Sequence, residues 1–210
     1  MDQLILVRHG ETVWNREKIF RGRMDVALDE LGIRQAEALA RYLSEQNLQA
    51  IYSSPLKRAF ETANRIARYQ QVPVQAVEGL IDIDYGEWQS LSEQEVKRRY
   101  PALYEEWCNN PHRVTIPGGE NLEDVKERAV RVVNEAVSKH QGNVVLVSHR
   151  VVNKVLICFL LGLDNSHFWN IRQDVCGVTI FEHRHGRFIL TRHNDTSHLR
   201  GLQGALRDDF

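Results

Sequence analysis

Residues 4–12 read Leu-Ile-Leu-Val-Arg-His-Gly-Glu-Thr, and this stretch decides the fold that the sequence predicts. Its first four residues form a continuous apolar run, as expected for a central strand that is buried on both faces. Arg8 and His9 follow at once, so a guanidinium and an imidazole stand where that strand should end. Strands buried on both faces are typical of parallel sheets with helices on either side.

Strand-like runs alternate with stretches of helical periodicity along the chain. Further strands are predicted in residues 50–53, 74–77, 144–147, 178–181 and 188–190. The spacing of apolar residues predicts helices in residues 33–43, 55–67, 92–107, 122–139 and 151–161. This alternation predicts an α/β fold, a three-layer sandwich in which a mostly parallel sheet is flanked by helices.

Capping and turn residues mark where several of these elements should begin and end. Asp29 is the expected N-cap of the first long helix. Pro55, directly after Ser54, is the expected first residue of the next helix. Gly186 lies between the last two strands and predicts a hairpin turn, which would give the sheet one antiparallel edge strand.

Length and charge limit the classes of protein that the chain can represent. A chain of 210 residues suits a single domain over residues 1–210 with one core. The formal net charge of −1 provides no general basic field, so we expect neither nucleic acid nor a membrane surface as a partner. An anionic substrate must therefore be attracted by a local cluster of arginines.

Cysteine usage and the apolar segments favour a cytoplasmic protein. Cys108, Cys158 and Cys176 are widely spaced and form no Cys-x-x-Cys pair, as expected for free thiols in reducing surroundings. The apolar run near the N-terminus is too short for a signal peptide. Asn153 and Lys154 interrupt the longest apolar stretch, which is too short to span a bilayer.

Residues with useful chemistry follow three of the predicted strands. Arg8 and His9 follow the first strand, and His149 comes just after the fourth. Arg58 lies on the helix that follows the second strand. Because ligands of open α/β sheets bind beyond the carboxyl ends of the strands, we expect these four side chains to meet at one rim.

This combination of side chains suits phosphoryl transfer. Guanidinium groups are always charged and bind a tetrahedral dianion through paired hydrogen bonds. An imidazole can attack phosphorus and hold it as a phosphoramidate, and a second imidazole, if protonated, would stabilise the equatorial oxygens. The leaving alkoxide then needs a proton from a carboxylic acid, for which Asp82, Asp84 and Glu87 are the candidates.

At these positions the sequence resembles the histidine phosphatase superfamily, in the branch of the cofactor-dependent phosphoglycerate mutases and small broad-specificity phosphatases. The matching motifs are Arg-His-Gly-Glu-Thr at 8–12 with Trp14 and Asn15, Gly22 and Asp25, Leu28 and Gly32, Ser-Ser-Pro-Leu-Lys-Arg-Ala-Phe-Glu-Thr-Ala at 53–63, Asp82 with Gly86 and Trp88, Gly-Gly-Glu-Asn at 118–121 and Val-Ser-His at 147–149. They occur in the family's order over most of the chain.

The resemblance implies a role for each matching residue. His9 becomes the phosphohistidine nucleophile, and Asp82 falls where the family carries its general acid, a position that relatives usually fill with Glu. Asn15 is similar to a residue that contacts phosphate oxygens. The rest of the implied phosphate pocket is formed by Arg8, Arg58 and His149.

Four further residues are candidates for contacts with the rest of the substrate. Arg21 stands where relatives often have Gln, and Arg150 stands where they usually have Gly, so both add positive charge near the rim. Tyr85 lies in the acidic and aromatic segment after Asp82. His198 resembles a C-terminal histidine that approaches the substrate in some short phosphatases.

The resemblance favours a phosphatase that hydrolyses phosphate monoesters of small metabolites and needs no metal or other cofactor. Phosphoglycerate mutase is the alternative, but the mutases of this branch usually have longer chains. A non-catalytic phosphate-binding module is a remote alternative. The pair His183-x-His185 has no nearby set of further metal ligands in the sequence and predicts a solvated turn. Homodimerisation is an open expectation, because dimers are the commonest homo-oligomers.

Overall fold

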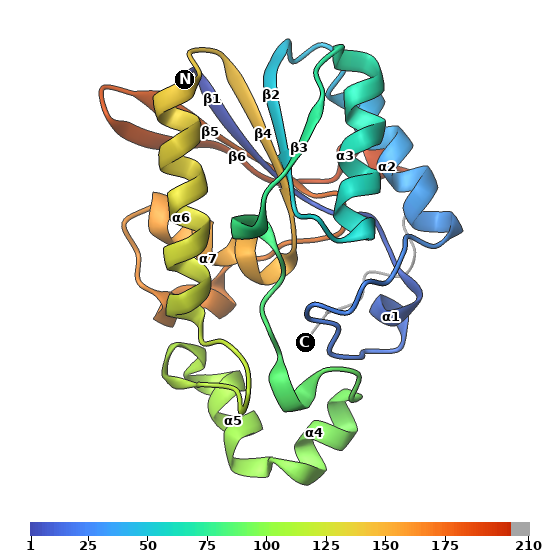
Figure 1. Cartoon of the computed structure of the whole chain (residues 1–210), viewed down its shortest axis with the longest axis vertical. Coiled ribbons are helices and arrows are strands. Elements are labelled where there is room, and N and C mark those ends of the chain that lie inside the picture. Colours follow the sequence, from blue (N-terminus) through green and yellow to red (C-terminus); the bar gives the residue numbers. More distant parts are fainter. Residues whose placement is uncertain (203–210) are drawn as a thin grey trace.

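The computed structural model describes residues 1–202, and a six-stranded sheet forms its centre (Figure 1). The strands are β1 (Gln3–Arg8), β2 (Leu48–Ser53), β3 (Val74–Ala76), β4 (Asn143–Ser148), β5 (Val178–Arg184) and β6 (Arg187–Asp195). Their order across the sheet is β3-β2-β4-β1-β5-β6. The first four of these are parallel, whereas β5 runs antiparallel to both β1 and β6. The predicted α/β fold is confirmed, with β5 just inside the edge rather than at it.

Alternate residues of β1 face opposite layers of the core, as the pleat of a strand requires. Leu4 and Leu6 pack into the cluster that contains α6 (Leu122–Lys139) and α7 (Arg150–Leu160). Ile5 and Val7 pack into the cluster that contains α2 (Glu30–Tyr42) and α3 (Lys57–Gln70). Figure 1 shows these two helix pairs on opposite sides of the sheet. The continuous apolar run therefore reflects burial on both faces, as predicted.

Two predicted helix boundaries are wrong, and proline accounts for the first. The single helix expected over residues 92–107 is divided into α4 (Glu93–Arg99) and α5 (Pro101–Asn109), because Pro101 has no backbone N–H and disfavours helical geometry at Tyr100. The helix expected to begin at Pro55 begins at Lys57. Ser54, directly after β2, donates its backbone N–H to the Val147 carbonyl of β4, and Leu56 is the N-cap of the helix.

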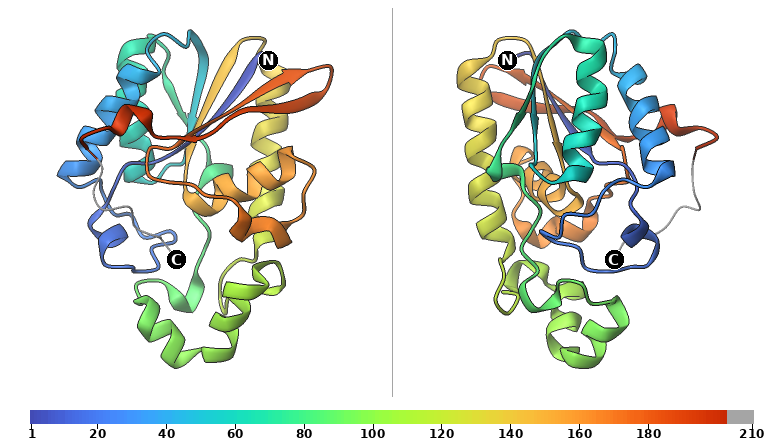
Figure 2. Two further views of the ribbon diagram at one scale, coloured as in Figure 1. Left: turned by 180° about the vertical axis from the view of Figure 1, so that it is seen from behind. Right: turned by 45° about the vertical axis from the view of Figure 1, so that its right-hand side comes forward.

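The helices α4 and α5 lie beyond the carboxyl ends of the parallel strands, where Figure 2 also shows them. A cluster of aromatic rings connects them to the rest of the molecule. Trp88, Tyr104 and Trp107 are buried, and Trp107 packs edge-on against both Trp88 and Trp169. The Trp169 indole N–H also donates to the Trp107 carbonyl, at 2.7 Å. The short α1 (Val13–Arg16) lies at the same end.

The remaining elements agree with the sequence-based expectations. Asp29 caps α2 by accepting a hydrogen bond from the Gly32 N–H. His185 and Gly186 both have positive φ in the turn between β5 and β6, which suits a tight hairpin. Within residues 1–202, no helix is long and apolar enough to cross a membrane.

Candidate active site

The strand register brings the four predicted phosphate-pocket residues together. Arg8 pairs with Ser148 across β1 and β4, so His9 and His149 both emerge directly beyond this pair. Their ring centroids are 5.2 Å apart. Arg58, on the first turn of α3, joins them because β2 pairs with the other side of β4. All four side chains are buried, with at most 2% of each residue exposed.

The orientation of His9 identifies its reactive nitrogen. Nδ1 lies 2.6 Å from the Gly10 carbonyl oxygen, which can only accept, so Nδ1 carries the proton and donates it. The other ring nitrogen, Nε2, then keeps its lone pair. Gly10 itself must be small, since a Cβ there would lie 2.6 Å from the Gly32 carbonyl oxygen. The glycine after His9 thus allows the start of α2 to approach the backbone beside His9.

Both imidazoles of the site are neutral without a bound anion. Burial and the nearby Arg58 guanidinium, together with Arg8 and Arg21, hold the pKa of His9 well below its ordinary value of 6.5. Burial also lowers the pKa of His149 well below 6.5, together with the charges of Arg58, Arg21, Arg128 and Arg8. A neutral imidazole is the form that can attack phosphorus. His149 accordingly becomes a cation only if a bound dianion offsets the arginines.

Arg58 is fixed by three oxygen acceptors. Its Nη1 donates to the Met24 carbonyl at 2.8 Å, and its Nη2 donates to the Gly22 carbonyl at 2.8 Å. The same Nη2 pairs with Asp82 Oδ2 at 3.0 Å. Gly22 has φ +49°, a conformation that glycine adopts without strain and that turns the 20–25 loop toward Arg58. The loop therefore orients the Arg58 guanidinium.

Asp82 is the one candidate acid of the three that joins this group. Its Oδ2 lies 3.5 Å from His149 Nδ1 as well as 3.0 Å from Arg58, and the residue is 5% exposed. Asp84 instead accepts from the Gly86 N–H and faces Arg23. Glu87 accepts from the Tyr100 hydroxyl.

Asn15 lies on α1 with its amide group held in a defined orientation. Its Oδ1 accepts from both the backbone N–H and the hydroxyl of Thr12, each at 2.9 Å. The amide nitrogen is consequently the group that Asn15 can offer to a phosphate oxygen. The residue is 6% exposed.

A small cavity of about 20 Å³ adjoins Asp82. The predicted substrate contacts Arg21, Tyr85 and Arg150 all line it, and its other walls are Ile19, Phe20, Gly22 and Val151. Tyr85 hydrogen-bonds with Arg150, and burial raises the pKa of Tyr85 to about 12, so its hydroxyl stays protonated. The cavity thus combines two guanidiniums with a small apolar wall.

The structure does not bring His198 into this group. Its ring stacks on Tyr42 at the end of α2, with centroids 4.8 Å apart, and its polar neighbours are Asp195 and the Cys176 carbonyl. The predicted role of His198 as a substrate contact therefore has no support in the arrangement of the described residues.

Two residues of the site were not recognised in the sequence. Ser54 Oγ lies 2.8 Å from Nε2 of His149 and orients that ring. The Gln173 carbonyl accepts from Arg8 Nη1 at 2.8 Å. Ser54 could have been found, because it follows β2 at the same rim, whereas a backbone carbonyl in a loop gives no signal in the sequence.

The family model of the histidine phosphatase superfamily (branch 1) matches residues 4–196. The chain belongs to this superfamily. It is 38% identical over 200 residues to phosphoserine phosphatase 1 of Hydrogenobacter thermophilus, an alignment that covers 95% of each chain. Among solved structures, Bacillus stearothermophilus YhfR has a TM-score of 0.90 at 33% identity, covering 94% of this chain and 98% of the other. Phosphoserine phosphatase of Entamoeba histolytica, crystallised with 3-phosphoglyceric acid, has a TM-score of 0.85 at 30% identity, covering 95% and 100%.

The lowered pKa values of the two histidines predict how stability depends on pH. Below pH 6.5 the unfolded chain takes up protons that His9 and His149 in the folded chain do not, so the free energy of unfolding should fall on acidification. The loss amounts to about 1.4 kcal/mol per histidine for each unit of pKa difference. Urea unfolding at pH 7.5, 6.5 and 5.5 without phosphate measures it.

A double variant, His9→Asn with His149→Asn, should lose most of this pH dependence. His112→Asn, at an exposed position, is the matched control and should keep it. If the free energy of unfolding depends on pH equally strongly in the double variant and the wild type, the lowered pKa values of His9 and His149 are contradicted.

Proposed function

We propose that this chain hydrolyses phosphate monoesters of small metabolites through a covalent phosphohistidine on His9. By its family and its relatives it is a phosphomonoesterase hydrolase. The observation that carries the proposed mechanism is the buried His9, whose Nδ1 is committed to the Gly10 carbonyl while the charges of Arg58 and Arg8 help to lower its pKa. The lone pair of Nε2 is thereby available beside two fixed cations.

In the first step of the proposed reaction, Nε2 of His9 attacks phosphorus and the ester P–O bond breaks. The departing alkoxide takes a proton from the Asp82 carboxyl group. Arg8, Arg58 and Asn15 would hold the phosphoryl oxygens as negative charge spreads over them. His149, made cationic by the bound dianion, would add a further donor on the same side.

In the second step, water attacks the phosphohistidine and the P–N bond breaks. Asp82, now a carboxylate, accepts a proton from that water, which returns the acid to its starting form and releases inorganic phosphate. The Arg58–Asp82 contact supports this assignment by position, because it places the Asp82 carboxyl group beside a guanidinium proposed to hold the phosphoryl oxygens.

The cavity next to Asp82 supports a substrate class for this reaction. Arg21 and Arg150 give it two cationic walls, and Phe20 and Val151 restrict its size. A short leaving group with a carboxylate fits these properties, because guanidinium binds carboxylate through paired hydrogen bonds. Phosphoserine and 3-phosphoglyceric acid, which appear in the names of relatives, both carry a carboxylate close to the ester.

A cytoplasmic location also belongs to the proposal. Cys108, Cys158 and Cys176 are free thiols, as expected in reducing surroundings. Burial raises the pKa of Cys158 to about 11, which keeps that thiol protonated and unreactive. Homodimerisation stays a prediction.

The function is tested by measuring release of inorganic phosphate and isomerisation of 3-phosphoglycerate in parallel, both in EDTA. Hydrolysis of phosphoserine or 3-phosphoglycerate should outpace isomerisation, and His9→Ala should abolish turnover. Isomerisation that is faster than hydrolysis would make the chain a mutase. Full activity of His9→Ala would remove the proposed nucleophile.

The substrate class is tested by Arg21→Gln and Arg150→Gly. Each should raise KM for phosphoserine about tenfold, because a hydrogen bond to a charged group contributes about 1.5–3 kcal/mol. Both should leave KM nearly unchanged for glycerol 3-phosphate, whose leaving group, glycerol, carries no charge.

The matched control for these variants is Arg68→Gln, at an exposed position on α3, which should behave as wild type on both esters. If Arg21→Gln and Arg150→Gly raise KM for the two esters equally, the carboxylate assignment is wrong.

A further inference from the structure

Asp82 lies on a segment that no strand or α-helix holds in place. The segment follows the short helical turn Glu78–Leu80 and crosses the end of the sheet. Side chains bind the carbonyls of four successive residues, 79–82. Ser148 Oγ donates to the Leu80 carbonyl at 2.7 Å, and Arg128 supplies the donors for the other three.

Arg128 reaches this segment from the middle of α6. Its Nη1 donates to the carbonyls of Gly79 and Ile81, at 3.0 and 2.5 Å. Its Nη2 donates to the carbonyl of Asp82 itself, at 3.1 Å. One rigid guanidinium therefore fixes the backbone on both sides of the peptide bond that leads into Asp82.

The orientation of Arg128 is set by a bidentate pair with Glu120. Nε and Nη2 of Arg128 each lie 3.0 Å from a different oxygen of the Glu120 carboxylate. Glu120 also binds Asp84, two residues after Asp82. Its Oε2 accepts from the Asp84 N–H at 2.9 Å, and its own backbone N–H donates to the Asp84 carbonyl. The Arg128 and Glu120 side chains are only 12% and 16% exposed.

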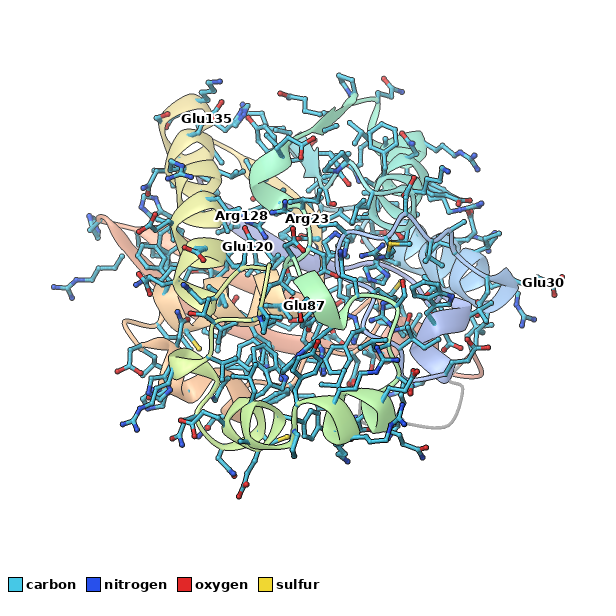
Figure 3. The ribbon with its side chains drawn as sticks, turned by 60° about the horizontal axis from the view of Figure 1, so that its bottom comes forward. Arg23, Glu30, Glu87, Glu120, Arg128 and Glu135 are labelled. Atoms are coloured by element: carbon cyan, nitrogen blue, oxygen red, sulfur yellow. The ribbon has the colours of Figure 1, made fainter. Side chains whose placement is uncertain are left out.

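Arg23 extends this network to the loop that holds Arg58. It pairs with Glu120 at 3.0 Å and with Asp84 at 3.5 Å. Its neighbour Gly22 supplies a carbonyl to Arg58. Figure 3 shows Arg23, Glu120 and Arg128 close together beside α6, whereas Glu135 lies far along the same helix.

We propose that Arg128 is a positioning residue for proton transfer, which holds the Asp82 carboxyl group within reach of the leaving oxygen. This inference rests on the proposed role of Asp82 as the acid. Arg128 is not among the residues that line the cavity, and its donors go to the backbone that carries Asp82. A displacement of about 1 Å at a reacting group can cost a hundredfold in rate. The restraint on the backbone of Asp82 therefore matters for proton transfer to the leaving oxygen but not for the attack by His9.

The test compares an alkyl ester, phosphoserine, with an activated aryl ester, 4-nitrophenyl phosphate, whose leaving group needs no proton. Arg128→Met should lower kcat for phosphoserine by about 10- to 100-fold, with little change in KM. The rate on the aryl ester should fall by less than about threefold, since His9 chemistry is intact. Arg131→Met, an exposed position on the same helix, is the matched control and should match wild type on both.

Asp82→Asn decides between failure of the inference and failure of the proposed function. It should itself be selective for the alkyl ester, and adding Arg128→Met to it should cause no further loss on phosphoserine. Equal losses on both esters in Arg128→Met, or additive losses in the double variant, would overturn the positioning role. Absence of selectivity in Asp82→Asn would overturn the acid assignment on which the inference rests.

Arg128→Lys keeps the inference testable if Arg128→Met unfolds, which thermal unfolding would reveal. Lysine retains the charge but cannot bind three carbonyls and a carboxylate at once. It should show the same selective loss on phosphoserine at a smaller size. Wild-type kcat on phosphoserine in Arg128→Lys, with a normal midpoint of thermal unfolding, would contradict the inference.

Discussion

The structure depends on the burial of the Arg58 guanidinium at the carboxyl end of the parallel strands. A charge removed from water is costly unless oxygen acceptors replace the lost hydration. The carbonyls of Gly22 and Met24 and the carboxylate of Asp82 provide that replacement. The same requirement explains why the 20–25 loop, the start of α3 and the segment around Asp82 converge on one point. A bound phosphate would provide further negatively charged oxygen acceptors for the Arg58 guanidinium.

The positive charge gathered at this site also influences the protonation state of His9 and His149. Arg58, Arg8 and Arg21 lower the pKa of both imidazoles, which favours the neutral form that the proposed attack by His9 requires. A dianion between the rings reverses the local potential and favours protonation of His149. The nearly neutral net charge of the chain is compatible with anion binding because the arginines are gathered at one rim.

Much of the fold could be predicted from local patterns, because the buried strands and long helices carry strong periodicity. The apolar runs located β1 and β4, and the spacing in residues 122–139 gave both ends of α6. The break at Pro101 was missed because the apolar spacing continues across it. Within the site, the strand ends and the family motifs identified His9 and Asp82 as candidate residues. Arg128 was not identified, since an arginine within a helix resembles surface charge until its partners, distant in sequence, are known.

The nucleophilic role of His9 is tested most directly by rapid acid-free quenching of the protein during turnover of phosphoserine labelled with ³²P, followed by peptide mapping. The label should appear within one turnover on the peptide that contains His9, and it should be lost in acid and retained in alkali, as a phosphoramidate requires. Label on a peptide with His149 or Asp82, or steady turnover with no labelled protein at any time, would contradict a phosphohistidine at His9.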